Sequence, residues 1–230
     1  MHTPTTEARP SIYYQYEVFK PWLASAHGPQ ARQRVVIVGS GPAGMVTALE
    51  LARHGVASVV LSSELQFSQG SRAICFTRRS MEILQQVGVA DRMTEGGLPW
   101  RFGNSYYRGQ RVFRMEAPHD PDDRFFPIIN VQQQFMEEYL HDACKANPLI
   151  DFRWGNKVNK VTQKEGYAEL EVDTPEGLYT LESDWVVAAD GGRSAIRTAM
   201  DLQMEGASYE GFFVIADIKI DLPLDRKSVV

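Results

Sequence analysis

The hydrophobic positions near the start of this chain follow the order strand, helix, strand. Residues 34–38 form a run rich in β-branched residues, which is typical of a strand buried on both faces of a parallel sheet. Residues 45–54 then carry apolar side chains at helical spacing, and Gly55 is suited to ending that helix. A second apolar run follows at 59–61. The pattern predicts a βαβ unit.

The rest of the chain alternates between helical and strand-like spacing. The patterns predict an amphipathic helix over 77–87 with Thr77 as its N-cap, a hairpin over 102–115 turning at 108–110, a helix over 131–146, short strands over 151–181 with turns near 165–166 and 175–177, a buried strand over 185–189, a short helix over 193–200 and a strand over 212–220. Together the elements predict an α/β fold, with a Rossmann-like domain that has a parallel sheet and a β-meander, followed by the beginning of a mixed-sheet domain.

The segment before the first strand, residues 1–33, is predicted to be an arm. It is polar at first and aromatic-rich from Tyr13 to Trp22. We expect these aromatic side chains to pack onto the surface of the domain.

Composition and charge narrow the function classes. The chain has 230 residues, 43% of them hydrophobic, and a formal charge of −5 with both signs interspersed, so nucleic acid is not expected as a partner. Its apolar runs are too short to cross a bilayer and its N-terminus has no apolar signal core, which predicts a soluble, cytoplasmic protein without a membrane partner. The histidines show no metal-ligand spacing. The two cysteines, Cys75 and Cys144, are expected to be reduced and buried.

The loop after the first strand matches G-x-G-x-x-G in the required context, between a buried strand and a helix. Its residues are Gly39, Ser40, Gly41, Pro42, Ala43 and Gly44. In this fingerprint the first glycine permits a tight turn, the second lets the backbone approach a pyrophosphate, and the third lets the helix pack closely on the strand. The amides at the helix start stabilise the diphosphate. The loop therefore predicts a dinucleotide site.

The end of the second strand departs from this fingerprint. An acidic residue usually stands there and binds the ribose hydroxyls, but the position falls on Ser62. A serine hydroxyl cannot accept hydrogen bonds from two hydroxyls as a carboxylate does. Glu64, two residues on, is the other candidate, and the alternative for Glu64 is a solvated loop residue.

Four stretches, at 35–56, 70–89, 130–140 and 185–197, resemble the FAD-dependent aromatic hydroxylases, whose type member is p-hydroxybenzoate hydroxylase. The 3-(3-hydroxyphenyl)propionate hydroxylase branch looks most similar. The resemblance makes the predicted domains an FAD-binding domain in two parts, 34–101 and 129–204, with a substrate-domain excursion over 102–128. Residues 205–230 would be the start of a truncated substrate domain. Truncation is expected because the Gly-Asp motif, which the family places farther downstream, is absent from the sequence.

The resemblance also implies roles for individual residues. Asp190 and Gly191 would contact the ribose-phosphate region of FAD and help to place the nicotinamide cofactor, to which Arg197 would be tied. From the residues alone, Asp190 could equally be a helix cap and Arg197 a surface charge. Arg72 would reach the pyrophosphate and Gln133 the diphosphate and ribityl chain, although Gln132 or Gln134 could take the place of Gln133. A backbone group of Val158 would meet the adenine.

The activity implied by the resemblance is NAD(P)H-dependent hydroxylation of a phenolic or other aromatic substrate. FAD, reduced by NADPH or NADH, would react with O2 to give a C4a-hydroperoxyflavin that attacks the ring. No catalytic acid or base can be named, and a homodimer is an option for the full-length protein. Two alternatives stay open: another FAD-dependent oxidoreductase of the same superfamily, or a non-catalytic, truncated fragment that binds a nucleotide weakly or not at all.

Overall fold

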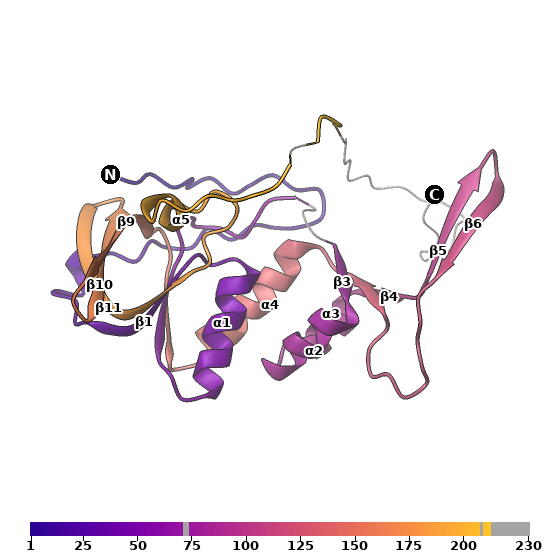
Figure 1. The fold of residues 1–230 in the computed structure, drawn as a ribbon, viewed down its shortest axis with the longest axis horizontal. Coiled ribbons are helices and arrows are strands. Elements are labelled where there is room, and N and C mark those ends of the chain that lie inside the picture. The colour runs from indigo at the N-terminus through magenta and orange to yellow at the C-terminus, as the bar shows by residue number, and fades with distance from the viewer. Residues whose placement is uncertain (71–73, 208, 213–230) are drawn as a thin grey trace. The chain divides into compact units, whose positions relative to one another are not determined.

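The computed structural model describes residues 1–70, 74–207 and 209–212, and Figure 1 shows the order of the elements. Two compact units are formed. The first combines Met1–Ser68 with Leu140–Phe212, and the described part of the second consists of residues 69–70 and 74–139. Most of the strand predicted over 212–220 lies outside the described residues. The predicted domain boundaries stay predictions.

A six-stranded sheet forms the centre of the first unit. Its order is β8-β2-β1-β11-β10-β9, and the strands are β1 (Gln33–Val38), β2 (Ser58–Leu61), β8 (Ile150–Arg153), β9 (Lys157–Lys164), β10 (Tyr167–Thr174) and β11 (Gly177–Ala188). β1 is parallel to β2 and β11, and β2 is parallel to β8. β9, β10 and β11 form an antiparallel meander. The α/β fold with a parallel sheet and a meander is confirmed.

Strand β11 belongs to both parts of this sheet. Ser183 is paired with Ala168 in the meander and with Gln33 in the parallel part. The separate, buried strand predicted over 185–189 was therefore wrong in two respects. Its residues continue one long strand, and Trp185 is 71% exposed. An apolar run identifies a strand but does not show whether both of its faces are covered.

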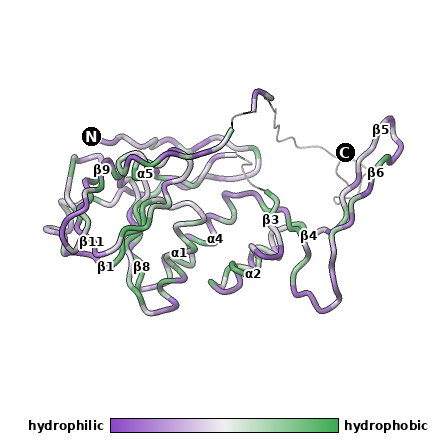
Figure 2. Tube along the Cα trace, in the orientation of Figure 1, coloured by the Kyte–Doolittle hydropathy of each residue, from purple (hydrophilic) through white to green (hydrophobic). Residues whose placement is uncertain are grey.

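Two helices of the first unit pack against strands of the six-stranded sheet. α1 (Pro42–Arg53) connects β1 to β2 and packs on β1, β2 and β8, while α5 (Ala195–Ala199) packs against β9. α1 begins three residues before the predicted start, because proline is well placed in a first helical turn. Apolar residues of β1, β2, β10, β11 and α1 form the buried core around the sheet: Val36, Ile37, Leu61, Leu170, Leu181 and Met45. Figure 2 shows the hydrophobic stretches of the chain in green.

The arm packs onto the first unit through its aromatic side chains, as predicted. Tyr16 is 5% exposed, and the Phe19 ring stacks on Trp154 with centroids 4.4 Å apart. The Arg153 guanidinium lies 3.9 Å from the centre of the Trp22 ring. Backbone bonds add to these contacts, since Trp22 N donates to the Trp154 carbonyl over 2.9 Å. A 3-10 helix, η1 (Ala24–Ala26), precedes β1.

The second unit contains a small antiparallel sheet, two helices and a hairpin. The sheet has the order β3-β7-β4, and the elements are β3 (Cys75–Thr77), α2 (Arg78–Gln86), α3 (Ala90–Gly96), β4 (Leu98–Trp100), β5 (Phe102–Tyr107), β6 (Gln110–Glu116) and β7 (Ile128–Asn130). The predicted cap is confirmed, because the Thr77 side chain accepts from Ser80 N. The sequence patterns predicted neither this sheet nor α3. Strands of three residues are too short to show an alternating pattern.

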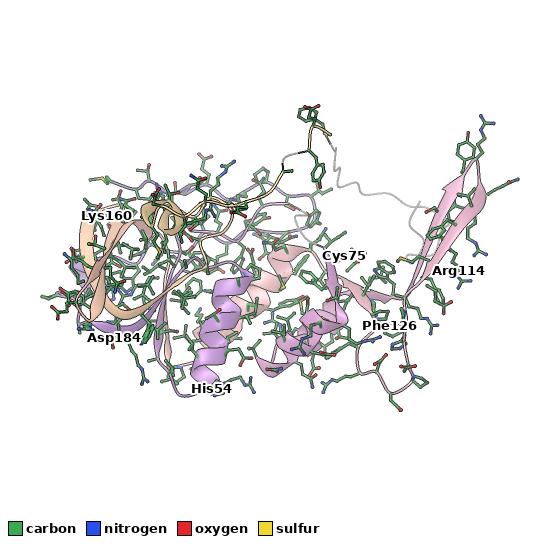
Figure 3. All side chains as sticks on the ribbon, viewed as in Figure 1. His54, Cys75, Arg114, Phe126, Lys160 and Asp184 are labelled. Atoms are coloured by element: carbon green, nitrogen blue, oxygen red, sulfur yellow. The ribbon has the colours of Figure 1, made fainter. Side chains whose placement is uncertain are left out.

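The predicted hairpin is present as β5 and β6, with Arg108 and Gly109 both at positive φ in its turn. Its side chains project to either side of the two strands, and Figure 3 labels Arg114 on it. Helix α4 (Gln133–Lys145) follows β7 and ends in the first unit.

The expectation that both cysteines are buried holds for one of them. Cys144 is fully buried, with Sγ 3.8 Å from the Met45 carbonyl of α1, and burial raises the pKa of this thiol to about 12. Cys75 is exposed, and its Sγ donates to Asn130 Oδ1 over 3.2 Å. Cys75 lies on the short strand β3, whose pattern gave no indication of which face is covered.

Candidate functional site

The glycine loop lies between β1 and α1, where two of its glycines are required by packing. Gly39 has φ 110°, and a Cβ atom there would lie 2.2 Å from the Ala189 carbonyl oxygen at the end of β11. A Cβ atom on Gly44 would lie 2.0 Å from the Gly39 carbonyl oxygen. The turn and the close approach of helix and strand that the fingerprint predicts are therefore both present.

Gly41 differs from these two glycines. Its φ of −72° and ψ of 178° are open to any residue. Apart from Gly41 itself and its two chain neighbours, no described residue has an atom within 4 Å of the position that a Cβ atom on Gly41 would take. Neither the backbone conformation nor the packing of the protein explains this glycine. The space beside it fits a group that approaches the backbone closely, as the diphosphate of a dinucleotide does.

The start of α1 adds an electrostatic preference for an anion. Gly41 is the N-cap, Pro42 follows in the first turn, and the part of the chain that the structure describes supplies neither a side-chain cap nor an acidic residue in that turn. The helix amides and the positive end of the helix dipole therefore point to a position without a competing carboxylate. This arrangement suits a diphosphate.

Asp190 and Gly191 follow β11 and lie beside the glycine loop. Ala189 N donates to the Val38 carbonyl over 2.8 Å, which holds this turn next to the end of β1. Gly191 has φ 77°, a conformation that favours glycine. A cavity of about 420 Å³ opens here, with Ala43 of α1 as well as Asp190 and Gly191 in its lining.

The alternative left open for Asp190, a role as a helix cap, is also observed. Its Oδ2 atom accepts from Ile196 N of α5 over 3.2 Å, and Ser194 caps the same helix. Arg197 borders the cavity, and its guanidinium donates to the Gly192 carbonyl over 2.9 Å. Asp190 thus has a local structural role while it lines a cavity next to the glycine loop. Its contact with a cofactor stays a prediction, as does that of Arg197.

Ser62 lies at the end of β2, as predicted, but its hydroxyl is occupied. The residue is 1% exposed, and its Oγ accepts from Ser40 Oγ over 2.7 Å. The same Oγ atom is 3.3 Å from both the backbone nitrogen and the carbonyl oxygen of Glu64. Ser62 therefore ties the glycine loop to the turn after β2.

The other predicted residues have different positions. Val158 of β9 is buried in the core of the sheet, and the contact of its backbone with the adenine stays a prediction. Gln133 is in the second unit, where Nε2 donates to Glu137 Oε1 over 2.6 Å. Gln134 is 0% exposed, which makes it the least accessible of the three neighbouring glutamines. Arg72 lies outside the described residues.

Sequence reasoning missed the polar contacts between the arm and the turn after β2. The Arg9 guanidinium lies 2.7 Å from Glu64 Oε2, and Gln66 Nε2 donates to the Glu7 carbonyl over 2.8 Å. His2 Nε2 is 2.5 Å from the Ser63 carbonyl oxygen. The residues of these three pairs are 55–61 positions apart in the sequence. No spacing in the sequence could have revealed them.

The described ranges contain no group of three or more His, Cys, Asp or Glu side chains that could hold a metal ion. His119 lies 3.5 Å from Asp123, whose carboxylate also pairs with Arg78 over 2.8 Å. No helix within 1–70, 74–207 and 209–212 is long and apolar enough to cross a membrane.

Known proteins are similar to this chain in sequence and in fold. The chain is 31% identical over 192 residues to 3-(3-hydroxy-phenyl)propionate/3-hydroxycinnamic acid hydroxylase 2 of Burkholderia vietnamiensis (strain G4 / LMG 22486), a match covering 82% of this chain and 35% of the relative. It is 26% identical over 196 residues to para-nitrophenol 4-monooxygenase of Pseudomonas sp. (strain WBC-3), covering 83% of this chain and 48% of the relative. The chain thus spans less than half the length of these relatives.

Solved structures of two monooxygenases are also similar to this chain. The crystal structure of p-nitrophenol 4-monooxygenase PnpA from Pseudomonas putida DLL-E4 matches with a TM-score of 0.73 and 28% identity, over 77% of this chain and 46% of that one. The flavin-dependent monooxygenase PieE, solved in complex with FAD and substrate, matches with a TM-score of 0.69 and 27% identity, over 78% of this chain and 34% of that one. The model of the family described as "FAD binding domain" matches residues 32–228. This chain therefore belongs to the FAD binding domain family, and its relatives are FAD-dependent aromatic hydroxylases.

Proposed function

We propose that the protein containing this chain is an NAD(P)H-dependent FAD monooxygenase that hydroxylates a phenolic or other aromatic small molecule. The observation that carries the proposal is the space beside Gly41 at the start of α1. It is the feature of the glycine loop that the protein's own packing does not explain. The relatives named para-nitrophenol 4-monooxygenase and 3-(3-hydroxy-phenyl)propionate/3-hydroxycinnamic acid hydroxylase support the aromatic substrate class.

The residues of this chain bind and orient the cofactor in this proposal. The backbone of Gly39 to Gly44 holds the diphosphate of FAD, since its amides and helix dipole favour an anion there. Asp190 and Gly191 border the cavity next to that loop and contact the ribose-phosphate region. The backbone at Val158 meets the adenine.

The remaining predicted contacts complete the assignment. Arg72 provides a guanidinium for the pyrophosphate, whose geometry it matches. Gln133 contacts the diphosphate and ribityl chain, and Arg197 interacts with the nicotinamide cofactor. FAD, when bound, supplies the redox chemistry, and the protein contributes position, electrostatics and exclusion of water.

The proposed reaction uses one NAD(P)H, one proton and one O2 for each hydroxyl group formed. NAD(P)H gives up a hydride, and with one proton the two electrons reduce one oxygen atom of O2 to water. The other oxygen atom is inserted into a C–H bond of the aromatic ring and becomes a hydroxyl group. The substrate is therefore oxidised by two electrons, and one O2 is consumed for each hydroxyl formed.

The test is purification with excess FAD, followed by activity measurements on the protein that retains flavin. We expect visible flavin absorption bands after gel filtration. NADH or NADPH should then reduce the flavin, and in the presence of a phenol ¹⁸O2 should label the hydroxylated product. A protein that binds FAD but transfers no ¹⁸O to any of a panel of phenols would indicate another FAD-dependent oxidoreductase. A protein that retains no flavin would contradict the cofactor assignment itself.

A further inference from the structure

The acidic residue that dinucleotide sites usually place at the end of the second strand is absent from its standard position. The Ser62 hydroxyl cannot replace it, because this hydroxyl is buried and is bonded to Ser40 and to the backbone of Glu64. A ribose presents two neighbouring hydroxyl groups, and a carboxylate is the side chain that accepts from both. If the cofactor binds as proposed, another group must therefore accept the hydrogen bonds of the ribose hydroxyls.

Glu64 is the carboxylate that the structure ties to this place. Its backbone nitrogen lies 3.3 Å from Ser62 Oγ, and Ser62 Oγ in turn accepts from Ser40 in the glycine loop. The Glu64 carbonyl accepts from Gly155 N over 3.0 Å, which fixes the turn after β2 to the turn after β8. The Glu64 side chain is 50% exposed, so its carboxylate is open to a ligand as well as to solvent.

Arg9 holds this carboxylate from the arm. The guanidinium lies 2.7 Å from Glu64 Oε2, and its NH1 atom donates to the Phe67 carbonyl. The backbone nitrogen of Arg9 donates to Gln66 Oε1 over 2.9 Å. The Arg9 side chain is only 19% exposed, so this is not an ordinary surface ion pair. Arg9 is therefore fixed at both its backbone and its side chain.

The arm itself is fastened on both sides of Arg9. Gln66, which is 3% exposed, donates through Nε2 to the Glu7 carbonyl, and Tyr16 donates to the Ser68 carbonyl over 3.0 Å. Farther along, Phe19 N donates to the Leu65 carbonyl over 2.8 Å. Each residue from Ser63 to Ser68 thus has a hydrogen bond or an ion pair with the arm. The arm therefore fixes the conformation of the turn after β2.

We propose that Glu64 accepts the hydroxyl groups of the adenosine ribose of FAD, and that Arg9 is a positioning residue that holds its carboxylate for this contact. The inference rests on the proposed function, and it makes the arm part of the cofactor site. Each ribose hydroxyl would donate to a carboxylate oxygen that Arg9 has already oriented. Because the carboxylate is fixed before binding, less conformational entropy is lost when the cofactor arrives.

The test compares FAD with its analogue that carries 2′-deoxyadenosine, bound to the protein after its flavin has been removed. Binding is followed by the change in flavin fluorescence, so no turnover is needed. The wild-type protein should prefer FAD over the deoxy analogue by roughly tenfold, the effect of one hydrogen bond to a charged group. Glu64→Gln should bind FAD roughly tenfold more weakly and should have lost the preference. Glu169→Gln, which removes the carboxylate of a half-exposed pair with Lys164, is the matched control and should keep it.

Arg9→Gln separates positioning from a purely structural role. We expect it to reduce the preference for FAD over the deoxy analogue, and to have no further effect when added to Glu64→Gln. A structural role alone would weaken the binding of both ligands equally and lower the melting temperature in both backgrounds. That result would overturn the role of Arg9.

The outcomes separate the two proposals. A wild-type protein that binds FAD and the deoxy analogue equally well, or a Glu64→Gln variant that keeps the preference, would overturn the assignment of Glu64 while the proposed cofactor stands. A wild-type protein that binds neither ligand would overturn the proposed function, and with it this assignment.

Discussion

The loop after β1 and the turn after β2 are assigned to neighbouring parts of one cofactor, yet they are built in different ways. The glycine loop is formed by contacts with the end of β11, and each of its required glycines can be explained by a backbone atom nearby. The turn after β2 is held by side chains from an arm more than 50 residues away in sequence, such as Arg9, which is 55 residues from Glu64. The first is a sequence motif, and the second is a tertiary arrangement that only the structure reveals.

The difference has a physical cause. A diphosphate is bound mainly by backbone amides, which any sequence provides once glycine permits the conformation. A ribose is bound by a side chain, so its partner can come from any part of the chain that reaches the place. The loop that binds the diphosphate should accordingly be recognisable from the sequence. The residue that binds the ribose can come from different positions in the chain and is harder to recognise.

Substitution of Gly39 is expected to have the largest effect. Gly39→Ala combines a φ of 110° with a Cβ atom 2.2 Å from the Ala189 carbonyl oxygen, so the free energy of unfolding should fall by about 3 kcal/mol or more. Urea denaturation of the flavin-free protein measures this change. A loss under about 1 kcal/mol would mean that the loop and the end of β11 are not packed as described.

Acidification is expected to cause the next largest fall in the free energy of unfolding, through the protonation of His141. His141 is 6% exposed and lies in the aromatic cluster beneath the arm, with the Phe19 and Phe67 rings 4.8 and 5.5 Å away. Burial lowers the pKa of His141 from 6.5 to about 4; nearby Asp142 acts in the opposite direction and Lys145 in the same direction. Trp154 Nε1 lies 3.3 Å from His141 Nε2, a contact that requires an unprotonated acceptor.

The sign of the pH effect follows from this shift. Between pH 6.5 and about 4 the unfolded chain binds a proton at His141 and the folded chain does not. The stabilising contribution is therefore present above pH 6.5 and is lost as the pH falls to about 4, by up to roughly 3 kcal/mol. Urea denaturation at a series of pH values tests this. His141→Phe should have a flatter profile in that window, and an unchanged profile would rule out His141 as the cause.

A smaller effect is expected at the contact that links the two regions. Ser62→Ala leaves Ser40 Oγ and the Glu64 backbone nitrogen without this partner, which should cost about 1 kcal/mol of stability. Affinity for FAD should change less than about threefold, since the hydroxyl does not contact the ribose in this account. Loss of FAD affinity with unchanged stability would show instead that Ser62 contacts the cofactor directly.

Much of the first unit could be predicted from sequence. The β-branched run of β1, the helical spacing of α1 and the glycines between them have one consistent interpretation, and the structure has the strand, the helix and the turn. The exposed face at Trp185 was not predictable, because hydrophobicity does not show which elements cover a strand. Cys75 was misjudged for the same reason.

The candidate site was only partly accessible to sequence reasoning. The fingerprint indicated that Ser62 was an unusual residue for its position, but not that its hydroxyl is bonded to Ser40. Glu64 was a candidate on proximity alone, and nothing in the sequence pointed to Arg9 or Gln66. Contacts between segments this far apart depend on the path of the arm, which leaves no periodic pattern.

The most direct test of the account is Gly41→Ala. Gly41 has an ordinary backbone conformation, and a Cβ atom there meets no described atom within 4 Å. The flavin-free variant should therefore be as stable as the wild-type protein to within about 1 kcal/mol, while its affinity for FAD, measured by flavin fluorescence, should fall at least about tenfold because the methyl group occupies the diphosphate's place. Unchanged affinity for FAD, together with unchanged stability, would contradict the assignment of this loop as the cofactor site.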